Sequence, residues 1–270
     1  MTEENSFSFG KNWQSFLCHI TEDRVQLAKQ SLTEFLNTEN LQGKTFLDIG
    51  CGSGLFSLSA YNLSADRIVS FDVDPFSVQC CKHMHLKAGY PENWQVTEGS
   101  ILDSAFARGL GKFDIVYSWG VLHHTGNMWE AINNAADRVG PEGKLYIALY
   151  NKTHGLNGSR LWLRIKKFYN FLPAPGKKVL EFLYSAMFCF TQLIRLKNPV
   201  TSIRNYQSKR GMNFITDVRD WLGGYPYEFA STDEVIGFIK QHYPDFHLIN
   251  LQSTPGTGNN WFLFQNASQR

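Results

Sequence analysis

The chain has 270 residues, of which 43% are hydrophobic and 14% aromatic, and its formal net charge is +2. This length suits one large domain, or one domain with a sizeable insertion, and the hydrophobic content is sufficient for a packed core. The five cysteines form no C-x-x-C pair and the first residues are acidic and polar. We therefore expect a cytoplasmic protein with no disulfide framework, metal site or signal peptide.

Helical periodicity over residues 22–36 is followed by an alternation of strand-like and helix-like segments. Strands are expected at 45–49, 67–72, 94–98, 113–118 and 143–150, and helices at 53–62, 75–88 and 127–138. Such alternation predicts a parallel sheet with right-handed crossovers. In sheets of this kind a ligand binds at the carboxyl ends of the strands, so side chains at these ends are the first candidates for a site.

The most informative pattern ends the first of these strands. Residues 46–54 read Phe-Leu-Asp-Ile-Gly-Cys-Gly-Ser-Gly, with Asp48 two positions before the first of three glycines. Glycine tolerates positive φ and lets a ligand approach the backbone closely. Asp72 ends the next strand, about 20 residues beyond the last of these glycines, which is the spacing of a carboxylate that binds ribose hydroxyls. A dinucleotide fingerprint would need glycine at position 55, where this chain has Leu55.

The Asp-x-Gly-x-Gly-x-Gly pattern resembles motif I of the class I S-adenosylmethionine-dependent methyltransferases. Further segments match that family in the same order: the ribose-binding strand end at 71–74, the adenine loop at 99–103, the fourth strand at 113–118 and the turn at 139–145. The resemblance implies S-adenosyl-L-methionine as cofactor, bound by Asp48, Gly50, Cys51, Gly52, Asp72, Val73, Ser100, Ile101, Ser118 and Trp119. One departure is Ser100, where the family often carries Asp.

The alternation stops at Asn151 and resumes after Tyr225 with a helix from Thr232 (expected as its N-cap) to His242 and strands at 246–252 and 260–265. The resemblance implies an α/β, Rossmann-like class I methyltransferase fold: a mostly parallel sheet with an antiparallel C-terminal edge hairpin, helices on both faces and a helical cap insertion. We expect an N-terminal helical segment (1–42), a cofactor-binding core (43–151), a helical lid insertion (152–225) and the completion of the core sheet (226–270).

Catalytic candidates lie after the strands and in the insertion. His123 and His124 follow the fourth strand in the loop that the resemblance places against the donor methyl, and imidazole suits a general base at neutral pH. The alternative is that they only bind the backbone through hydrogen bonds. Tyr150 ends the fifth strand. Asp217 lies in a polar group with Arg219 and Asp220, whose alternative role is an internal network that closes the lid.

Between residues 152 and 210 the chain has twelve Lys or Arg and one acid, a balance of +11 that leaves −9 for the remainder. Basic residues beside aromatic stretches indicate an anionic acceptor, a helix at a membrane interface, or a soluble core face with lysine stems packed on it. Of the first two, we favour the acceptor. A nucleic-acid substrate is disfavoured, because Ser118-Trp119-Gly120 replaces the base-flipping motif. The sequence indicates no oligomeric state.

Two functions follow from these patterns. The first is an enzyme that moves a methyl group by in-line displacement to an oxygen or nitrogen of a small-molecule or biosynthetic-intermediate acceptor. The second is a catalytically inactive methyltransferase-like binding or membrane-surface protein that acts through its basic aromatic insert. The intact acids and glycines of the cofactor motif favour the enzyme.

Overall fold

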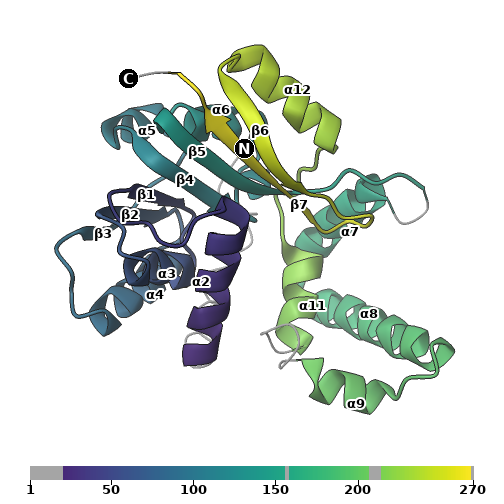
Figure 1. Cartoon of the computed structure of the whole chain (residues 1–270). Coiled ribbons are helices and arrows are strands. Elements are labelled where there is room, and N and C mark those ends of the chain that lie inside the picture. Colours follow the sequence, from purple (N-terminus) through teal and green to yellow (C-terminus); the bar gives the residue numbers. More distant parts are fainter. Residues whose placement is uncertain (1–20, 156–157, 207–213, 269–270) are drawn as a thin grey trace.

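The computed structural model describes residues 21–155, 158–206 and 214–268, and its centre is a seven-stranded sheet (Figure 1). The strands are β1 (Thr45–Ile49), β2 (Arg67–Asp72), β3 (Trp94–Glu98), β4 (Phe113–Trp119), β5 (Val139–Tyr150), β6 (Phe246–Gln252) and β7 (Asn259–Asn266). They lie in the order β3-β2-β1-β4-β5-β7-β6. The first five pair in parallel, whereas β7 is antiparallel to both β5 and β6. The expected fold class is therefore confirmed.

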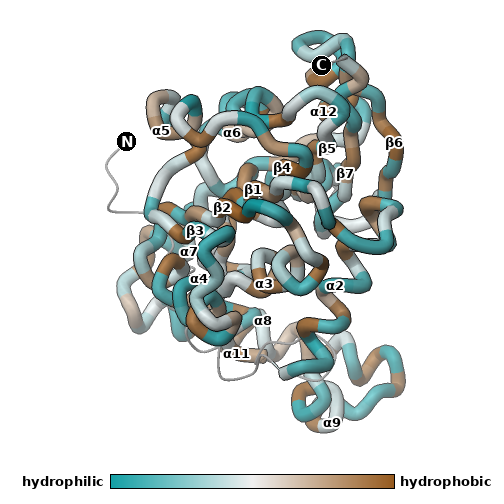
Figure 2. Tube along the Cα trace, turned by 60° about the vertical axis from the view of Figure 1, so that its left-hand side comes forward, coloured by the Kyte–Doolittle hydropathy of each residue, from teal (hydrophilic) through white to brown (hydrophobic). Residues whose placement is uncertain are grey.

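Helices cover both faces of the sheet (Figure 1). On one side lie α2 (Glu22–Leu36), α3 (Leu55–Asn62) and α4 (Pro75–Lys87), and on the other α5 (Ser104–Gly109), α6 (Met128–Ala136) and α12 (Thr232–His242). Neighbouring strand residues point to opposite cores, as strand geometry requires. Phe46 lies in the hydrophobic cluster that contains Leu32 of α2, and Leu47 lies in the cluster that contains Ala131 of α6. Figure 2 shows the hydrophobic residues concentrated along the central strands.

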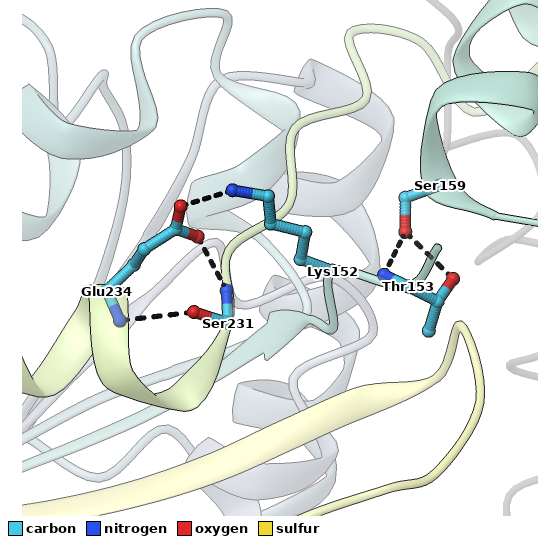
Figure 3. Close-up of polar contacts among 5 residues, drawn as sticks. All are labelled: Lys152, Thr153, Ser159, Ser231 and Glu234. Carbon is cyan, nitrogen blue, oxygen red and sulfur yellow. Dashed lines mark hydrogen bonds and ion pairs between the residues drawn. The ribbon is translucent and has the colours of Figure 1, made fainter. Parts of the chain in front are cut away.

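Element ends differ from the sequence predictions where the backbone is constrained. Helix α3 begins at Leu55 rather than at 53, because Gly52 and Gly54 adopt positive φ values of 51° and 78°. The N-cap of α12 is Ser231 rather than Thr232: its hydroxyl accepts from the Glu234 N–H, and the Glu234 carboxylate accepts from the Ser231 N–H (Figure 3). The short helix α5 was not expected. Residues 1–20 of the expected N-terminal segment lie outside the described residues.

The inserted segment forms α7 (Ser159–Phe171), α8 (Ala174–Ile194), α9 (Pro199–Arg204) and α11 (Phe214–Gly223), which we call the cap. The cap has its own hydrophobic cluster, built around Trp162, Tyr169, Phe214, Val218 and Leu222. In Figure 1 the cap lies to one side of the sheet, with α8 and α9 furthest from the strands. No helix within the described ranges is both long and apolar enough to cross a membrane.

Both ends of the cap leave the sheet at one place. Asn151 forms a β-bridge with Ala230, and the Lys152 N–H donates to the Ala230 carbonyl at 3.1 Å. The ammonium of Lys152 then pairs with Glu234 at the start of α12, and the Ser159 hydroxyl at the start of α7 accepts from the Thr153 N–H at 2.9 Å (Figure 3). These contacts anchor the base of the cap beside the carboxyl end of β5.

Candidate active site

A cavity of about 1530 Å³ is lined both by the carboxyl ends of β1, β2, β4 and β5 and by the cap. It brings together most of the site residues predicted from the sequence, although they come from elements far apart in the chain. The predicted residues that line it are Asp48, Gly50, Cys51, Gly52, Asp72, Val73, Ser100, Ile101, Trp119, His124, Tyr150 and Asp217. Two predicted residues, Ser118 and His123, are not in its lining.

The glycine turn after β1 is packed too tightly for side chains. Gly50 has a φ of +71°, and a Cβ there would lie 2.4 Å from Val121 Cγ1. At Gly54 (φ +78°), a Cβ would lie 2.8 Å from the Cys81 Cα on α4. The Gly50 N–H donates to the Phe71 carbonyl of β2 at 2.8 Å, which fixes the turn to the neighbouring strand. The turn therefore presents backbone, not side chains, to the cavity at Gly50 and Gly52.

Asp72 is tied to this turn from the end of β2. Its Oδ2 accepts from the Gly52 N–H at 3.0 Å, and its Oδ1 accepts from the Asp74 N–H at 3.0 Å. Burial raises the pKa of the Asp72 carboxyl, while these backbone hydrogen bonds oppose the rise. Each carboxylate oxygen has further lone pairs, so the group can still accept hydrogen bonds from a ligand in the cavity.

Asp48 lies deeper, with 2% of its surface exposed, at the end of a chain of buried hydrogen bonds. The Ser57 hydroxyl donates to Asp48, the Ser70 hydroxyl donates to Ser57 at 2.7 Å, and the Trp94 Nε1–H donates to Ser70 at 2.9 Å. Burial raises the pKa of Asp48 to about 7, with the Ser57 hydrogen bond opposing the rise. A cationic ligand group in the cavity would favour its ionised form.

The predicted adenine loop also reaches the cavity. Ser100 and Ile101 line it, and the Ser100 hydroxyl accepts from the Leu102 N–H at 3.2 Å, which shapes the turn. Ser118 has a different role from the one expected. Its buried hydroxyl donates to the Ile49 carbonyl at 3.1 Å and so joins β4 to β1 inside the sheet.

The two adjacent histidines lie in the 3-10 turn η2 (Leu122–His124) but in different surroundings. His124 lines the cavity, and its Nδ1 is 2.5 Å from the Pro226 carbonyl oxygen. Because a carbonyl only accepts, Nδ1 carries the proton and Nε2 carries the lone pair of the neutral ring. Burial lowers the pKa of His124 to about 3, so its ring is neutral at pH 7.

His123 is fully buried and does not line the cavity. Its Nδ1 accepts from the Tyr150 N–H at 3.3 Å, and its ring centroid lies 4.0 Å from that of Tyr150. Burial, with smaller effects from His124 and Lys166, keeps the pKa of His123 well below its ordinary value. His123 therefore supports Tyr150, which itself lines the cavity, and does not reach the cavity directly.

The cap contributes an aromatic wall that the sequence analysis did not identify residue by residue. Its members are Trp162, Tyr184, Phe188, Tyr206, Phe214, Trp221 and Tyr225. Spacing by four residues puts Tyr184 and Phe188 on one face of α8, but the apolar residues of this helix extend well beyond that face, so periodicity alone could not identify the inner face. Asp217 and Asp220 also line the cavity.

Two charged residues of the cap differ from expectation. Arg219, predicted to lie in a polar group with Asp217 and Asp220, pairs instead with Glu181 of α8 at 3.1 Å. Lys166, one of the twelve basic residues between 152 and 210, is fully buried. Its ammonium donates to the Trp221 carbonyl and lies 4.6 Å from the centre of the Trp221 ring. Burial lowers the pKa of Lys166 to about 7.

Comparison with known proteins agrees with this geometry. The family model described as "Methyltransferase domain" matches residues 20–187. A ubiquinone biosynthesis O-methyltransferase from Methylobacterium sp. (strain 4-46) is 31% identical over 118 residues, which are 44% of this chain and 45% of the relative. A ribosomal protein L11 methyltransferase from Helicobacter hepaticus is 39% identical over 85 residues, 31% of this chain and 25% of the relative. The chain thus spans less than half the length of these relatives.

Among solved structures, the magnesium protoporphyrin IX methyltransferase from Synechocystis PCC 6803 with bound SAH superposes with a TM-score of 0.53. The identity is 14%, and the match covers 90% of this chain and 83% of that one. At this identity the likeness concerns the fold. The family match, the sheet order and the glycine turn with its acid partner agree: the chain belongs to the class I S-adenosylmethionine-dependent methyltransferases.

Proposed function

We propose that this protein transfers a methyl group from S-adenosyl-L-methionine to an oxygen or nitrogen of an acceptor with a large apolar or aromatic part. The observation that carries the proposal is the single cavity, which joins the glycine turn and Asp72 to the aromatic wall of the cap. Its volume of about 1530 Å³ exceeds the usual range for one drug-sized ligand, roughly 300–1,000 Å³, so a cofactor and an acceptor can share it.

The residues at the sheet end of the cavity fit the cofactor. Asp72 would accept from the ribose hydroxyls, and the side-chain-free backbone at Gly50 and Gly52 would lie against the methionine part. Val73, Ser100 and Ile101 would surround the adenine. Asp48, at the floor, would favour the positive charge of the amino group. The bound cofactor supplies a methyl group already activated on a sulfonium, so the protein's remaining task is to place the acceptor.

The cap end fits the acceptor. Flat aromatic side chains such as Trp162, Phe188 and Trp221 would hold an apolar ring system and exclude water from the reacting atoms. Placement of this kind can lower a barrier by roughly 7–11 kcal/mol. The name of the Methylobacterium relative supports oxygen as the accepting atom, and the size of the aromatic wall supports an acceptor larger than a metabolite of a few carbons.

His124 is the proposed general base, in preference to His123. It lines the cavity, and its Nδ1 proton is held by the Pro226 carbonyl, which leaves Nε2 as the basic nitrogen. Its lowered pKa keeps the ring neutral at pH 7 but makes it a weak base. The acceptor hydroxyl becomes strongly acidic as its oxygen gains the methyl group, so the ring would take the proton during the transfer rather than before it. Tyr150 and Asp217 are proposed to bind the acceptor's polar groups.

Methyl transfer can be tested with labelled S-adenosyl-L-methionine and a panel of phenols, carboxylic acids and amines that carry apolar groups of increasing size. We expect transfer to a phenol that improves with apolar size, and a loss of about 10²–10⁴-fold in kcat for His124→Gln with unchanged cofactor affinity. Val179→Ala, on the outer side of α8, is the control. Tight binding of S-adenosylhomocysteine without transfer to any acceptor would instead support the inactive, binding-protein alternative.

A further inference from the structure

The apolar residues of helix α8 form two faces, and only one of them is covered. Its inner face, with Leu180, Tyr184 and Phe188, packs into the hydrophobic cluster of the cap. Its outer face consists of Val179, Phe182, Leu183, Met187, Phe190, Leu193 and Ile194, all of them more than half exposed. These positions recur at helical spacing, so they form one continuous stripe, which we call the outer face of α8. An apolar stripe of this width on a helix is normally buried.

Charge is distributed around this stripe in a specific way. No charged residue occurs between Phe182 and Ile194, whereas Lys178 precedes this stretch and Arg195 and Lys197 follow it. These three basic side chains are exposed. The one acid of the helix, Glu181, is turned into the cap, where it accepts from the Tyr169 hydroxyl at 2.8 Å and from Arg219 at 3.1 Å. The outer face therefore combines exposed apolar side chains with positive charge at both ends and no exposed acid within the stripe.

This combination selects one kind of partner. A second copy of the chain would bring two sets of basic ends together, which like-charge repulsion disfavours. An anionic lipid surface offers both an apolar layer for the stripe and negative headgroups for the basic ends. The uncharged stretch of thirteen residues would extend about 20 Å as a helix, which is short of the roughly 30 Å hydrocarbon core, so the helix would lie in the plane of the interface.

We propose that the outer face of α8 docks the protein on the surface of an anionic bilayer, with the basic residues at the headgroups. In Figure 1 α8 and α9 are the helices of the cap furthest from the strands. Tyr184 and Phe188, on the inner face of the same helix, line the cavity. Resting on the proposed function, this places the acceptor cavity one helix away from the membrane, from which an acceptor with a large apolar part would enter.

Docking can be measured by flotation of the full chain with vesicles of phosphatidylcholine containing about a third phosphatidylglycerol, at low salt and at about 0.5 M salt. We expect flotation at low salt that falls steeply at high salt and is weak on pure phosphatidylcholine. Phe182→Glu/Phe190→Glu should reduce the bound fraction at least tenfold, because both side chains, 71% and 62% exposed, would lose their apolar contact. Leu27→Glu on α2, at a side chain that is 64% exposed, is the matched control and should float like the wild type.

A second variant separates charge from apolar contact. Lys178→Gln/Arg195→Gln/Lys197→Gln keeps the stripe intact and should weaken flotation several-fold while removing most of its salt dependence. Affinity for S-adenosylhomocysteine should be the same in all these proteins, so failure of docking is distinguishable from failure of the proposed function. Absence of wild-type flotation at low salt would overturn the proposal. So would equal flotation of the outer-face variant, or a dimer that this variant abolishes without any vesicle binding.

Discussion

Replacing Asp72 by alanine tests the cofactor end of the cavity directly. The Asp72 carboxylate is the acceptor for the Gly52 and Asp74 N–H groups, each at 3.0 Å, and lines the cavity. Asp72→Ala therefore removes both the proposed partner of the ribose hydroxyls and the contact that holds the glycine turn to the end of β2. Both effects act in the same direction on cofactor affinity.

The size of the loss follows from the hydrogen bonds involved. Leaving buried polar groups of a ligand unpaired costs about 1–3 kcal/mol, which corresponds to a roughly 5- to 150-fold increase in the Kd of S-adenosylhomocysteine. The unpaired backbone groups of the turn would push the value towards the upper end. Isothermal titration calorimetry measures this change in the full chain.

Asp103→Ala provides the matched control. This carboxylate caps α5 by accepting from the Ala105 and Phe106 N–H groups at 2.9 and 3.1 Å, but it is not part of the cavity lining. We expect this variant to lose some stability and to keep the wild-type affinity. An unchanged Kd in Asp72→Ala would refute the assignment of Asp72, and wild-type binding of NAD as tight as that of S-adenosylhomocysteine would refute the cofactor assignment.

Two further predictions concern the glycine turn and the buried lysine. Gly50→Ala should destabilise the protein by about 1–3 kcal/mol more than Gly43→Ala in chemical denaturation, because both sites have positive φ but only Gly50 would place a Cβ 2.4 Å from a neighbouring side chain; equal losses would mean that Val121 moves aside. Burial lowers the pKa of Lys166 from 10.5 in the unfolded chain to about 7 in the folded protein. Between these two pH values the unfolded chain binds more protons, so the free energy of unfolding should rise with pH there. Lys166→Met should remove that rise, which is at most about 1.4 kcal/mol per pH unit. Lys167→Met, at an exposed lysine, should keep it. Parallel pH profiles of the unfolding free energy in wild type and Lys166→Met would contradict the burial argument.

The cofactor end of the cavity was predictable from the sequence because its requirements are local. A turn that must expose backbone needs glycines at fixed positions, and Asp48 and Asp72 lie at strand ends that a parallel sheet brings to one edge. The order of strands and helices along the chain then determined the fold class. Short segments of sequence were therefore sufficient to predict that these residues line the cavity.

The acceptor end was decided by tertiary packing. His123 and His124 are consecutive and chemically identical, yet one packs behind Tyr150 and the other lines the cavity, because η2 turns them in different directions. Ser118, unlike the other predicted cofactor residues at strand ends, faces the interior of the sheet, where its hydroxyl donates a hydrogen bond to the Ile49 carbonyl. Such distinctions depend on which face of an element meets which neighbour.

In the cap, too, the sequence alone could not predict which side chains are buried and which are exposed. Lys166 belongs to a basic segment that looks uniformly exposed in sequence, but packing of α7 against α11 buries its ammonium under Trp221. Helix α8 has apolar residues on both its packed and its exposed face, so its periodicity could not indicate which face lines the cavity and which faces outward. The sequence by itself determined that a basic, aromatic insertion follows β5; only the docking of helices on one another decided that one side of α8 lines the cavity and the other is exposed.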